Sequence, residues 1–397
     1  MPDGNDQIEI SVIERLADIS PAQWNACAGT DNPFLRHEFL SALEDCEAVH
    51  PDTGWATRHV LIKDQNGALL ACAPMYLKGH SMGEYVFDWG WAEAYERAGG
   101  SYYPKLICGV PFTPVTGPRL MVRGGISGTL CNTLKSQLAQ TMSGAATAAI
   151  LSSLHANFIS ESDTDVFTDA GYLPRLGLQY HWENRSYATY DDFLSELTSR
   201  KRKALKKERR AALQDGAITI EHVSGDEIRP EHWDALYAFY MDTSARKWGR
   251  PYLNRAFFAL LGERMAEDVI LIFARQDGDI IAGALNLIGG EALYGRYWGC
   301  KVDVRFLHFE LCYHQAIDMA IERGLKRVEA GAQGEHKIAR GYLPVLTHSA
   351  HFIPDEGFRD SVAQFLKHER RSILHERDLL MEESPYRKGK PRATIGP

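Results

Sequence analysis

A faint internal repeat constrains the fold of this chain more than any other sequence feature, because related halves fold into related units. The segment LIKDQNGALLACAP, from Leu61, aligns with IFARQDGDIIAGAL, from Ile272. Each copy has an apolar run, a turn with glycine at Gly67 or Gly278, and a second apolar run. This pattern predicts a β-hairpin in each half, followed by a further strand-like segment.

A second pair of similar blocks follows in the same order. In both halves the strand-like segment finishes with Trp-Gly, and GYLPRLGLQYHW from Gly171 then aligns with GYLPVLTHSAHF from Gly341. The first half holds 41 more residues between its hairpin and its GYLP block than the second half does. We place this insertion at about 92–128, a stretch rich in glycine, proline and aromatic residues.

Between the blocks each half carries a helical pattern and a short strand. The helices are expected at 129–142 and 307–323, and the strands at 150–156 and 327–331. Each half is therefore expected to be an α+β layer, in which helices pack on a mixed, mostly antiparallel sheet. The expected organisation is an N-terminal domain at 1–187, a C-terminal domain at 188–384 that starts with a basic helix, and a disordered tail at 385–397.

Composition excludes several classes of protein. The net charge of −8 means that any binding to nucleic acid needs a local basic patch. The seven cysteines include no CxxC motif, which argues against a disulfide framework and a zinc ribbon, and we expect no metal and no permanently bound cofactor. The N-terminus has no signal-peptide pattern, and no stretch has the ~20 mostly apolar residues of a membrane span. We expect a cytoplasmic protein.

One local patch is strongly basic. The segment SRKRKALKKERR at 199–210 contains eight basic residues and one acidic residue, Glu208, and is expected to lie within one helix from about 190 to 214. Such a helix is suited to neutralise several phosphates, as in RNA, with little reading of sequence. A solvated helix face is the alternative. The candidate phosphate-binding residues are Arg200, Lys201, Arg202, Lys203, Lys206, Lys207, Arg209 and Arg210.

The glycine-rich turn GAQGEHK at 331–337 is the candidate catalytic segment, because it follows a predicted strand that ends in Glu329. Acyl transfer to an amine needs a base, a donor for the developing oxyanion and an acid for the leaving group. The alternative is a turn whose charged side chains lie in water. The candidate catalytic residues are Glu329, Glu335, His336 and Lys337, with Gln333 and Arg340 as neighbouring substrate-binding residues.

The strand LYGRYWG at 293–299 is a candidate for substrate binding. Strand alternation predicts that Tyr294, Arg296 and Trp298 point to one side, where they would form the wall of an acyl pocket. Core packing is the alternative, because strands favour aromatic residues. Lys247, in a helix end before a proline turn, is a further candidate for contact with an acceptor or a tRNA end, with a purely structural turn as the alternative.

The insertion and its approach contain a group of aromatic residues with polar surroundings. We interpret this group as a lid that binds the acceptor, with Trp89 and Arg119 as its candidate contacts.

The order of elements in each half resembles the GNAT acyltransferase fold, here in tandem. The segment YAFYMDTSARKWGRPYLNRAFFALLGER at 237–264 is similar to a passage of the Fem-type peptidoglycan aminoacyltransferases. A bacterial family described as predicted N-acyltransferases or peptidoglycan biosynthesis/recognition proteins resembles the chain over most of its length. The segments that carry this resemblance are NPFLRHEFLSALE, PFTPVTGPRL, LYGRYWG and GAQGEHKIARGY.

The resemblance implies an N-acyltransferase that moves an acyl or aminoacyl group from an activated donor to an amine acceptor such as a peptidoglycan precursor. It also implies a functional lysine near Lys337. GNAT enzymes that use acetyl-CoA carry a glycine-containing phosphate loop, but here the segment at 300–310 reads CKVDVRFLHFE without glycine. This departure favours aminoacyl-tRNA over acyl-CoA as co-substrate. The alternatives are an acyl-CoA-dependent enzyme acting on a small amine and a recognition protein without catalysis.

Overall fold

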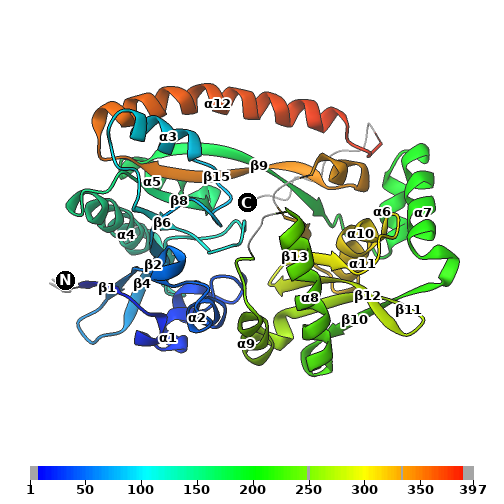
Figure 1. Ribbon diagram of the computed structural model, residues 1–397. Helices are drawn as coiled ribbons and strands as arrows, with labels where there is room; N and C mark the ends of the chain where they lie inside the picture. The colour runs from blue at the N-terminus through cyan, green and yellow to red at the C-terminus, as the bar shows by residue number, and fades with distance from the viewer. Residues whose placement is uncertain (1–7, 248–250, 332–333, 388–397) are drawn as a thin grey trace. The chain divides into compact units, whose positions relative to one another are not determined.

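The computed structural model describes residues 8–247, 251–331 and 334–387 (Figure 1). The chain divides into two compact units. The first unit comprises Met1–Gly177 and Leu346–Leu374, and the second comprises Leu178–Val345 and His375–Pro397. The expected boundary at 187/188 differs from this division, because a segment near the C-terminus belongs to the first unit.

The first unit contains two sheets. One has the strand order β1-β3-β4-β7, and in the other β8, β6, β5 and β2 follow one another and the last part of β15 pairs with β8. The strands are β1 (Glu9–Ile13), β2 (Trp55–Thr57), β3 (His59–Lys63), β4 (Leu69–Ala73), β5 (Met75–Lys78), β6 (Lys105–Cys108), β7 (Met121–Val122), β8 (Leu154–Ile159) and β15 (Leu343–Phe352). The helices of this unit are α1 (Pro21–Ala28), α2 (His37–Asp45), α3 (Trp89–Arg97), α4 (Gly128–Ala148), α5 (Thr164–Asp169) and the first part of α12 (Glu356–Glu382).

The second unit has one sheet with the strand order β10-β11-β12-β13-β14-β9. Its strands are β9 (Leu173–Glu183), β10 (Ile218–Ser224), β11 (Val269–Gln276), β12 (Asp279–Gly289), β13 (Ala292–Cys300) and β14 (Arg327–Glu329). The helices are α6 (Tyr190–Glu196), α7 (Ser199–Ala212), α8 (Pro230–Lys247), α9 (Arg255–Met265), α10 (Leu307–Phe309), a π-helix (Glu310–His314) and α11 (Gln315–Glu322). A 3-10 helix, η8, covers Glu335–Arg340.

Both predicted hairpins are confirmed. Strands β3 and β4 pair antiparallel around Gly67, and β11 and β12 pair antiparallel around Gly278. Both glycines have a left-handed backbone, with φ of 78° and 88°, which residues with a Cβ rarely adopt. The first hairpin bends at Pro74, because β4 belongs to one sheet and β5, directly after this proline, belongs to the other.

The Trp-Gly match and the insertion are not placed as expected. Trp89 and Gly90 begin helix α3, whereas Trp298 and Gly299 lie in β13. The strand that occupies the corresponding position in the first unit is β6, which lies inside the stretch at 92–128 and pairs parallel with β8. In the second unit β13 pairs parallel with β14 in the same way. The stretch is therefore an insertion around a strand of the sheet and not a loop alone.

The strand after each GYLP block changes unit. Strand β9 starts in the first unit and its last residues pair with β14 of the second, while β15 starts in the second unit and its last residues pair with β8 of the first. Each sheet is thus completed by a strand that begins in the other half of the repeat. This exchange explains why Leu346–Leu374 belongs to the first unit.

The predicted helix at 190–214 is two helices. It breaks after α6, where Leu197 has an extended backbone and bridges to Tyr386, and α7 starts at Ser199. The tail expected to be disordered from 385 is placed as far as Arg387, and residues 388–397 lie outside the described residues. Among the described helices, none is long and apolar enough to cross a membrane.

Candidate functional site

The second unit presents an open edge where two parallel strands separate. Strands β13 and β14 pair at only three positions, from Ala292 with Arg327 to Tyr294 with Glu329. Beyond this point β14 ends and the glycine-rich turn follows, whereas β13 continues to Cys300. The carboxyl ends of neighbouring parallel strands are the usual place for a ligand site in a sheet with helices on its faces.

Lys337 lies in η8, directly after this turn, and its side chain is only 2% exposed. Its Nζ donates to the carbonyl oxygen of Gly331 at 2.9 Å. Burial lowers the pKa of Lys337 to about 8; Cys312 acts against this shift and Arg296 adds to it. A buried ammonium that titrates near neutral pH is typical of functional sites.

Glu329 is buried and engaged in polar contacts. Its Oε1 accepts from Nε of Arg327 at 2.9 Å, and its Oε2 lies 3.9 Å from Nε2 of His181. Nη2 of Arg327 also reaches the hydroxyl of Tyr294 at 3.4 Å. Burial lowers the pKa of His181, Glu329 opposes the shift, and Arg327, Lys337 and Arg296 add to it. The charges of Arg327, Glu329, Lys337 and Arg296 therefore all act on the half-buried imidazole of His181.

The two candidates beside Lys337 differ from it in exposure. Glu335 and His336 are both exposed, and Nε2 of His336 lies 2.9 Å from the hydroxyl of Tyr313. The imidazole also packs against the ring of Phe309, with centroids 5.4 Å apart. Gln333 lies outside the described residues. The described part of the turn thus offers an exposed carboxylate and imidazole next to a buried ammonium.

Glu208 was noted in the sequence only as an acidic residue among cations, but it joins α7 to η8 and to the π-helix. Its carboxylate accepts from Nε and Nη2 of Arg340 at 2.8 and 2.6 Å and lies 2.9 Å from Nε2 of His314. Burial acts to raise the pKa of Glu208, but the bonds from His314 and Arg340 outweigh burial and lower it. The guanidinium also lies 3.4 Å from the ring centroid of Phe309 and donates to the carbonyl oxygen of His336. Arg340 therefore fixes η8 to α7.

The basic helix α7 has an inner and an outer face. Arg209 points inward, where it pairs with Glu310 at 2.8 Å and Asp318 at 2.6 Å. This contradicts its expected role in phosphate binding, because two buried or half-buried carboxylates already neutralise it. Lys206 pairs with Asp191 at the surface. The remaining cations are exposed or half-buried, namely Arg200, Lys201, Arg202, Lys203, Lys207 and Arg210.

The expected alternation along β13 is wrong, because the strand has a bulge. Gly295 pairs with Asn286 and Tyr297 with Leu285, so Arg296 is an extra residue. Tyr294 and Trp298 consequently face opposite sides of the sheet. Trp298 packs against the hydrophobic core of the unit, and Tyr294 is buried beside Arg327. Arg296 donates to the carbonyl oxygen of Gly295 at 2.9 Å.

The remaining candidates are Lys247 in the second unit and Trp89 and Arg119 in the first. Lys247 is the last residue of α8, and its side chain lies outside the described residues. In the first unit, Trp89 is 56% exposed and its ring lies 5.3 Å from that of Phe87. Arg119 is 0% exposed and donates to four backbone carbonyls, those of Val115, Gly117, Pro118 and Asn157. Arg119 thus organises the backbone of its unit and is not exposed for the expected contact with an acceptor.

Sequence reasoning missed three residues of the site: Glu208, His314 and Tyr190. The hydroxyl of Tyr190 lies 2.6 Å from Nδ1 of His314 and extends the contacts of Glu208 to α6. His314 ends the π-helix, an irregularity that is frequent at functional sites. The sequence does contain a pattern that could have identified Glu208. It lies on the same helix face as the apolar Leu205 and Ala212, both of which are buried, so this face was the one expected to pack inward.

Comparison with known proteins gives the fold and the family. FemX is similar at 12% identity over 89% of this chain and 100% of its own, with a TM-score of 0.52. The C-terminal domain of an Agrobacterium fabrum protein described as a lysylphosphatidylglycerol synthetase is similar at 12% identity over 88% and 96%, with a TM-score of 0.53. A tandem GNAT protein from the clavulanic acid biosynthesis pathway is similar at 10% identity over 88% and 100%, with a TM-score of 0.43.

The two matches with TM-scores above 0.5, FemX and the Agrobacterium fabrum domain, show a shared fold, and at 12% identity they leave the activity to other observations. The comparison with curated proteins found no match. The FemAB-like family model, described as peptidoglycan biosynthesis/recognition, matches residues 15–388. Nearly all of the chain is covered by that match, which agrees with the resemblance seen in its motifs. The chain therefore belongs to the FemAB-like peptidoglycan biosynthesis/recognition family.

Proposed function

We propose that this protein is a Fem-like N-acyltransferase, which transfers an aminoacyl or other acyl group from an activated donor to an amine acceptor. The observation that carries the proposal is the buried ammonium of Lys337 at the open edge between β13 and β14. The family description, peptidoglycan biosynthesis/recognition, supports a peptidoglycan precursor as the acceptor.

In the proposed reaction the acceptor nitrogen attacks the carbonyl carbon of the donor ester. A C–N bond forms, the ester C–O bond breaks, and the proton released by the amine goes to the departing hydroxyl. Lys337 already donates one hydrogen bond to Gly331 and has two further N–H groups to stabilise the developing oxyanion. Glu335 and His336, exposed beside it, are candidates to carry the proton.

We propose aminoacyl-tRNA as the donor. The outer face of α7 carries four exposed cations, Arg200, Lys203, Lys207 and Arg210, for which no carboxylate partner is found among the described residues, as a phosphate-binding surface requires. The segment before α10 contains Lys301 and Arg305, both exposed, but no glycine with which a backbone loop could approach a pyrophosphate. These two side chains are the observation in favour of the second candidate, an acyl-CoA donor.

The test is transfer by the purified full chain with two donors. We expect label from a pool of aminoacyl-tRNA to appear on a peptidoglycan precursor, and no transfer from acetyl-CoA. Lys337→Met should reduce transfer by about 10²- to 10³-fold, while Lys326→Met, a matched change at an exposed lysine of the same unit, should leave it unchanged. Transfer from acetyl-CoA alone would support the second candidate. A folded Lys337→Met variant with full activity would overturn the proposed site.

A further inference from the structure

A row of polar side chains crosses the sheet of the second unit at the open edge between β13 and β14. In the register of the strands, Tyr294 of β13 pairs with Glu329 of β14, and Glu329 pairs with His181 of β9. Directly paired residues of neighbouring strands project from the same face of a sheet. Because Glu329 is the last residue of β14, His181 lies at the end of that strand, just before the glycine-rich turn.

The contacts of His181 determine which ring nitrogen carries the proton. Its Nε2 lies 3.2 Å from Oε1 of Gln179 and 3.9 Å from Oε2 of Glu329, and both oxygens only accept hydrogen bonds. The proton therefore resides on Nε2, and Nδ1 carries a lone pair. Nδ1 has no hydrogen-bond partner among the described residues, and 12% of the side chain is exposed. The imidazole thus has a basic nitrogen that no described group occupies.

Glu329 is positioned to stabilise this ring once it is protonated. Its Oε1 accepts from Nε of Arg327 at 2.9 Å, whereas its Oε2 is buried and has no hydrogen-bond partner within the described part of the chain. The 3.9 Å between Oε2 and Nε2 of His181 is too long for a hydrogen bond. Catalytic hydrogen bonds are often long before substrate binds and shorten in the reacting complex. A positive charge on His181 would draw its Nε2–H to this unused oxygen.

The surroundings of His181 favour the neutral ring. Burial has the largest effect and lowers the pKa of His181; Glu329 opposes the shift, and Arg327 on β14, Lys337 on η8 and Arg296 on β13 add to it. A neutral imidazole is a common general base, because it can accept a proton near neutral pH. At pH 7 His181 is therefore in the form that accepts a proton.

The internal repeat provides a comparison, because His351 holds in the second GYLP block the position that His181 holds in the first. His351 pairs with His155 of β8 as His181 pairs with Glu329, but it is only 1% exposed. Both of its ring nitrogens are occupied. Nδ1 lies 2.6 Å from Nδ1 of His155, and Nε2 lies 3.1 Å from the hydroxyl of Ser349. His351 thus has no nitrogen left for a substrate.

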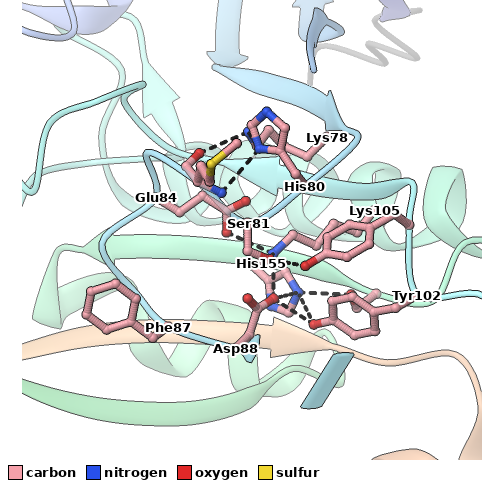
Figure 2. Close-up of polar contacts among 12 residues, drawn as sticks. Lys78, His80, Ser81, Glu84, Phe87, Asp88, Tyr102, Lys105 and His155 are labelled. Carbon is pink, nitrogen blue, oxygen red and sulfur yellow. Dashed lines mark hydrogen bonds and ion pairs between the residues drawn. The ribbon is translucent and has the colours of Figure 1, made fainter. Parts of the chain in front are cut away.

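The partner of His351 is enclosed as well. Nε2 of His155 lies 3.2 Å from the hydroxyl of Tyr102, 2.9 Å from that of Ser153 and 3.4 Å from Oδ2 of Asp88. Figure 2 shows Tyr102 and Asp88 beside this ring. The first unit therefore uses its histidine within a closed, buried cluster, whereas the second unit has a half-buried histidine beside a carboxylate at the edge of its sheet.

We propose that His181 is a further catalytic residue of the transfer reaction, in which Nδ1 takes the proton of the attacking amine and Glu329 stabilises the resulting imidazolium. This inference rests on the proposed function and names the base within it. As the C–N bond forms, the amine proton moves to Nδ1. As the ester C–O bond breaks, the same proton passes to the oxygen of the departing hydroxyl. Lys337 keeps its role as a donor to the developing oxyanion.

The kinetic test is His181→Asn in the full chain, assayed with labelled aminoacyl-tRNA and a peptidoglycan precursor. We expect kcat to fall by about 10²- to 10⁴-fold with little change in KM, the usual effect of losing a general base. The rate of the unchanged protein should fall at a pH below 6.5, because burial lowers the pKa of His181 from that value, and the variant should lack this fall.

His222→Asn is the matched control, because His222 is a strand histidine of the same unit whose Nε2 lies 2.9 Å from Oε1 of Gln315. It should keep full activity. A folded His181→Asn variant with unchanged kcat would overturn the proposal. An acid limb that disappears in Glu335→Gln or His336→Asn but persists in His181→Asn would overturn it as well.

A second measurement does not depend on activity. Nitrogen-15 NMR of the histidine side chains, assigned by the signals that His181→Asn lacks, reports the tautomer and the titration of each ring. We expect a proton on Nε2 at pH 7, a pKa of His181 below 6.5, and a still lower pKa in Glu329→Gln, which removes the carboxylate that opposes the shift. A proton on Nδ1, or a pKa above 6.5, would overturn the proposal even where transfer is observed.

The two measurements also separate this inference from the proposed function. Failure of the unchanged chain to transfer from either donor would overturn the proposed function itself. Transfer that continues in His181→Asn, or a ring with its proton on Nδ1, would overturn the role of His181 alone.

Discussion

Glu208 and Arg340, 132 residues apart in sequence, form a two-pronged ion pair with N–O distances of 2.8 and 2.6 Å. The pair joins the basic helix α7 to η8, which carries Lys337. A planar guanidinium matches a carboxylate in this geometry, which a lysine in place of Arg340 would not reproduce. The position of the candidate catalytic segment therefore depends on a residue of the basic helix.

Glu208→Gln is expected to lower the free energy of unfolding by about 3 kcal/mol, because it leaves the buried guanidinium of Arg340 without its counter-charge. Urea denaturation followed by fluorescence measures the change. Lys207→Gln, at the neighbouring exposed position, is the control and should change stability by less than about 0.5 kcal/mol. Equal urea midpoints for the two variants would show that the ion pair contributes nothing to stability.

Lys337→Met is expected to reduce transfer by about 10²- to 10³-fold, the usual effect of removing one donor to an oxyanion. If the ammonium is the active form, activity of the unchanged protein should fall as pH rises through about 8, the pKa to which burial lowers this lysine. Lys337→Arg stays charged above that pH, so any activity it retains should lack this fall. A pH–rate profile that rises through pH 8 would instead make Lys337 a general base.

Lys337→Met is also expected to raise the free energy of unfolding at pH 7. Because the pKa of Lys337 is lower in the folded than in the unfolded chain, the folded state binds fewer protons between about pH 8 and the ordinary pKa of lysine, ~10.4. Stability of the unchanged protein should therefore rise with pH across this window. Lys337→Met should be more stable below pH 8, by up to about 3 kcal/mol, and the advantage should shrink by pH 9.5. Thermal denaturation at both pH values checks the sign.

Replacing Lys203, Lys207 and Arg210 together by glutamine is expected to weaken binding of tRNA and to reduce the slope of log K against log salt by about 2. The fold should be unchanged, because these side chains are exposed. Filter binding between 50 and 200 mM salt measures the slope, a range over which phosphate contacts dominate.

Arg209→Gln provides the contrast on the same helix. It should destabilise the second unit, because it removes the partner of Glu310 and Asp318, and it should leave the salt slope nearly unchanged. A salt slope that drops as much for Arg209→Gln as for the triple variant would contradict the division of α7 into two faces.

Local sequence patterns predicted local structure well. The hairpin glycines Gly67 and Gly278 were identified because a left-handed turn favours glycine. The role of Lys337, taken from the resemblance to a family, stays a prediction. The break between α6 and α7 escaped prediction, because the contact that holds it is to Tyr386, far along the chain.

Long-range pairing was the main source of error. The sequence of β15 does not show which strand it will pair with. Its partner, β8, lies nearly 200 residues earlier in the chain. The inward turn of Arg209 depends in the same way on carboxylates on another helix. The bulge at Arg296 shifts side chains by one position, which an alternation count cannot anticipate.

The exchange of β9 and β15 has a consequence for synthesis on the ribosome. When the first 187 residues have emerged, the first unit still lacks the strand and helix at Leu346–Leu374 that complete it. The edge of β8 that pairs with β15 therefore has no partner strand until nearly all of the second unit has been synthesised. Folding of the repeat is consequently coupled from end to end, and a gene fragment that encodes one half alone should yield an aggregating polypeptide and not an independent domain.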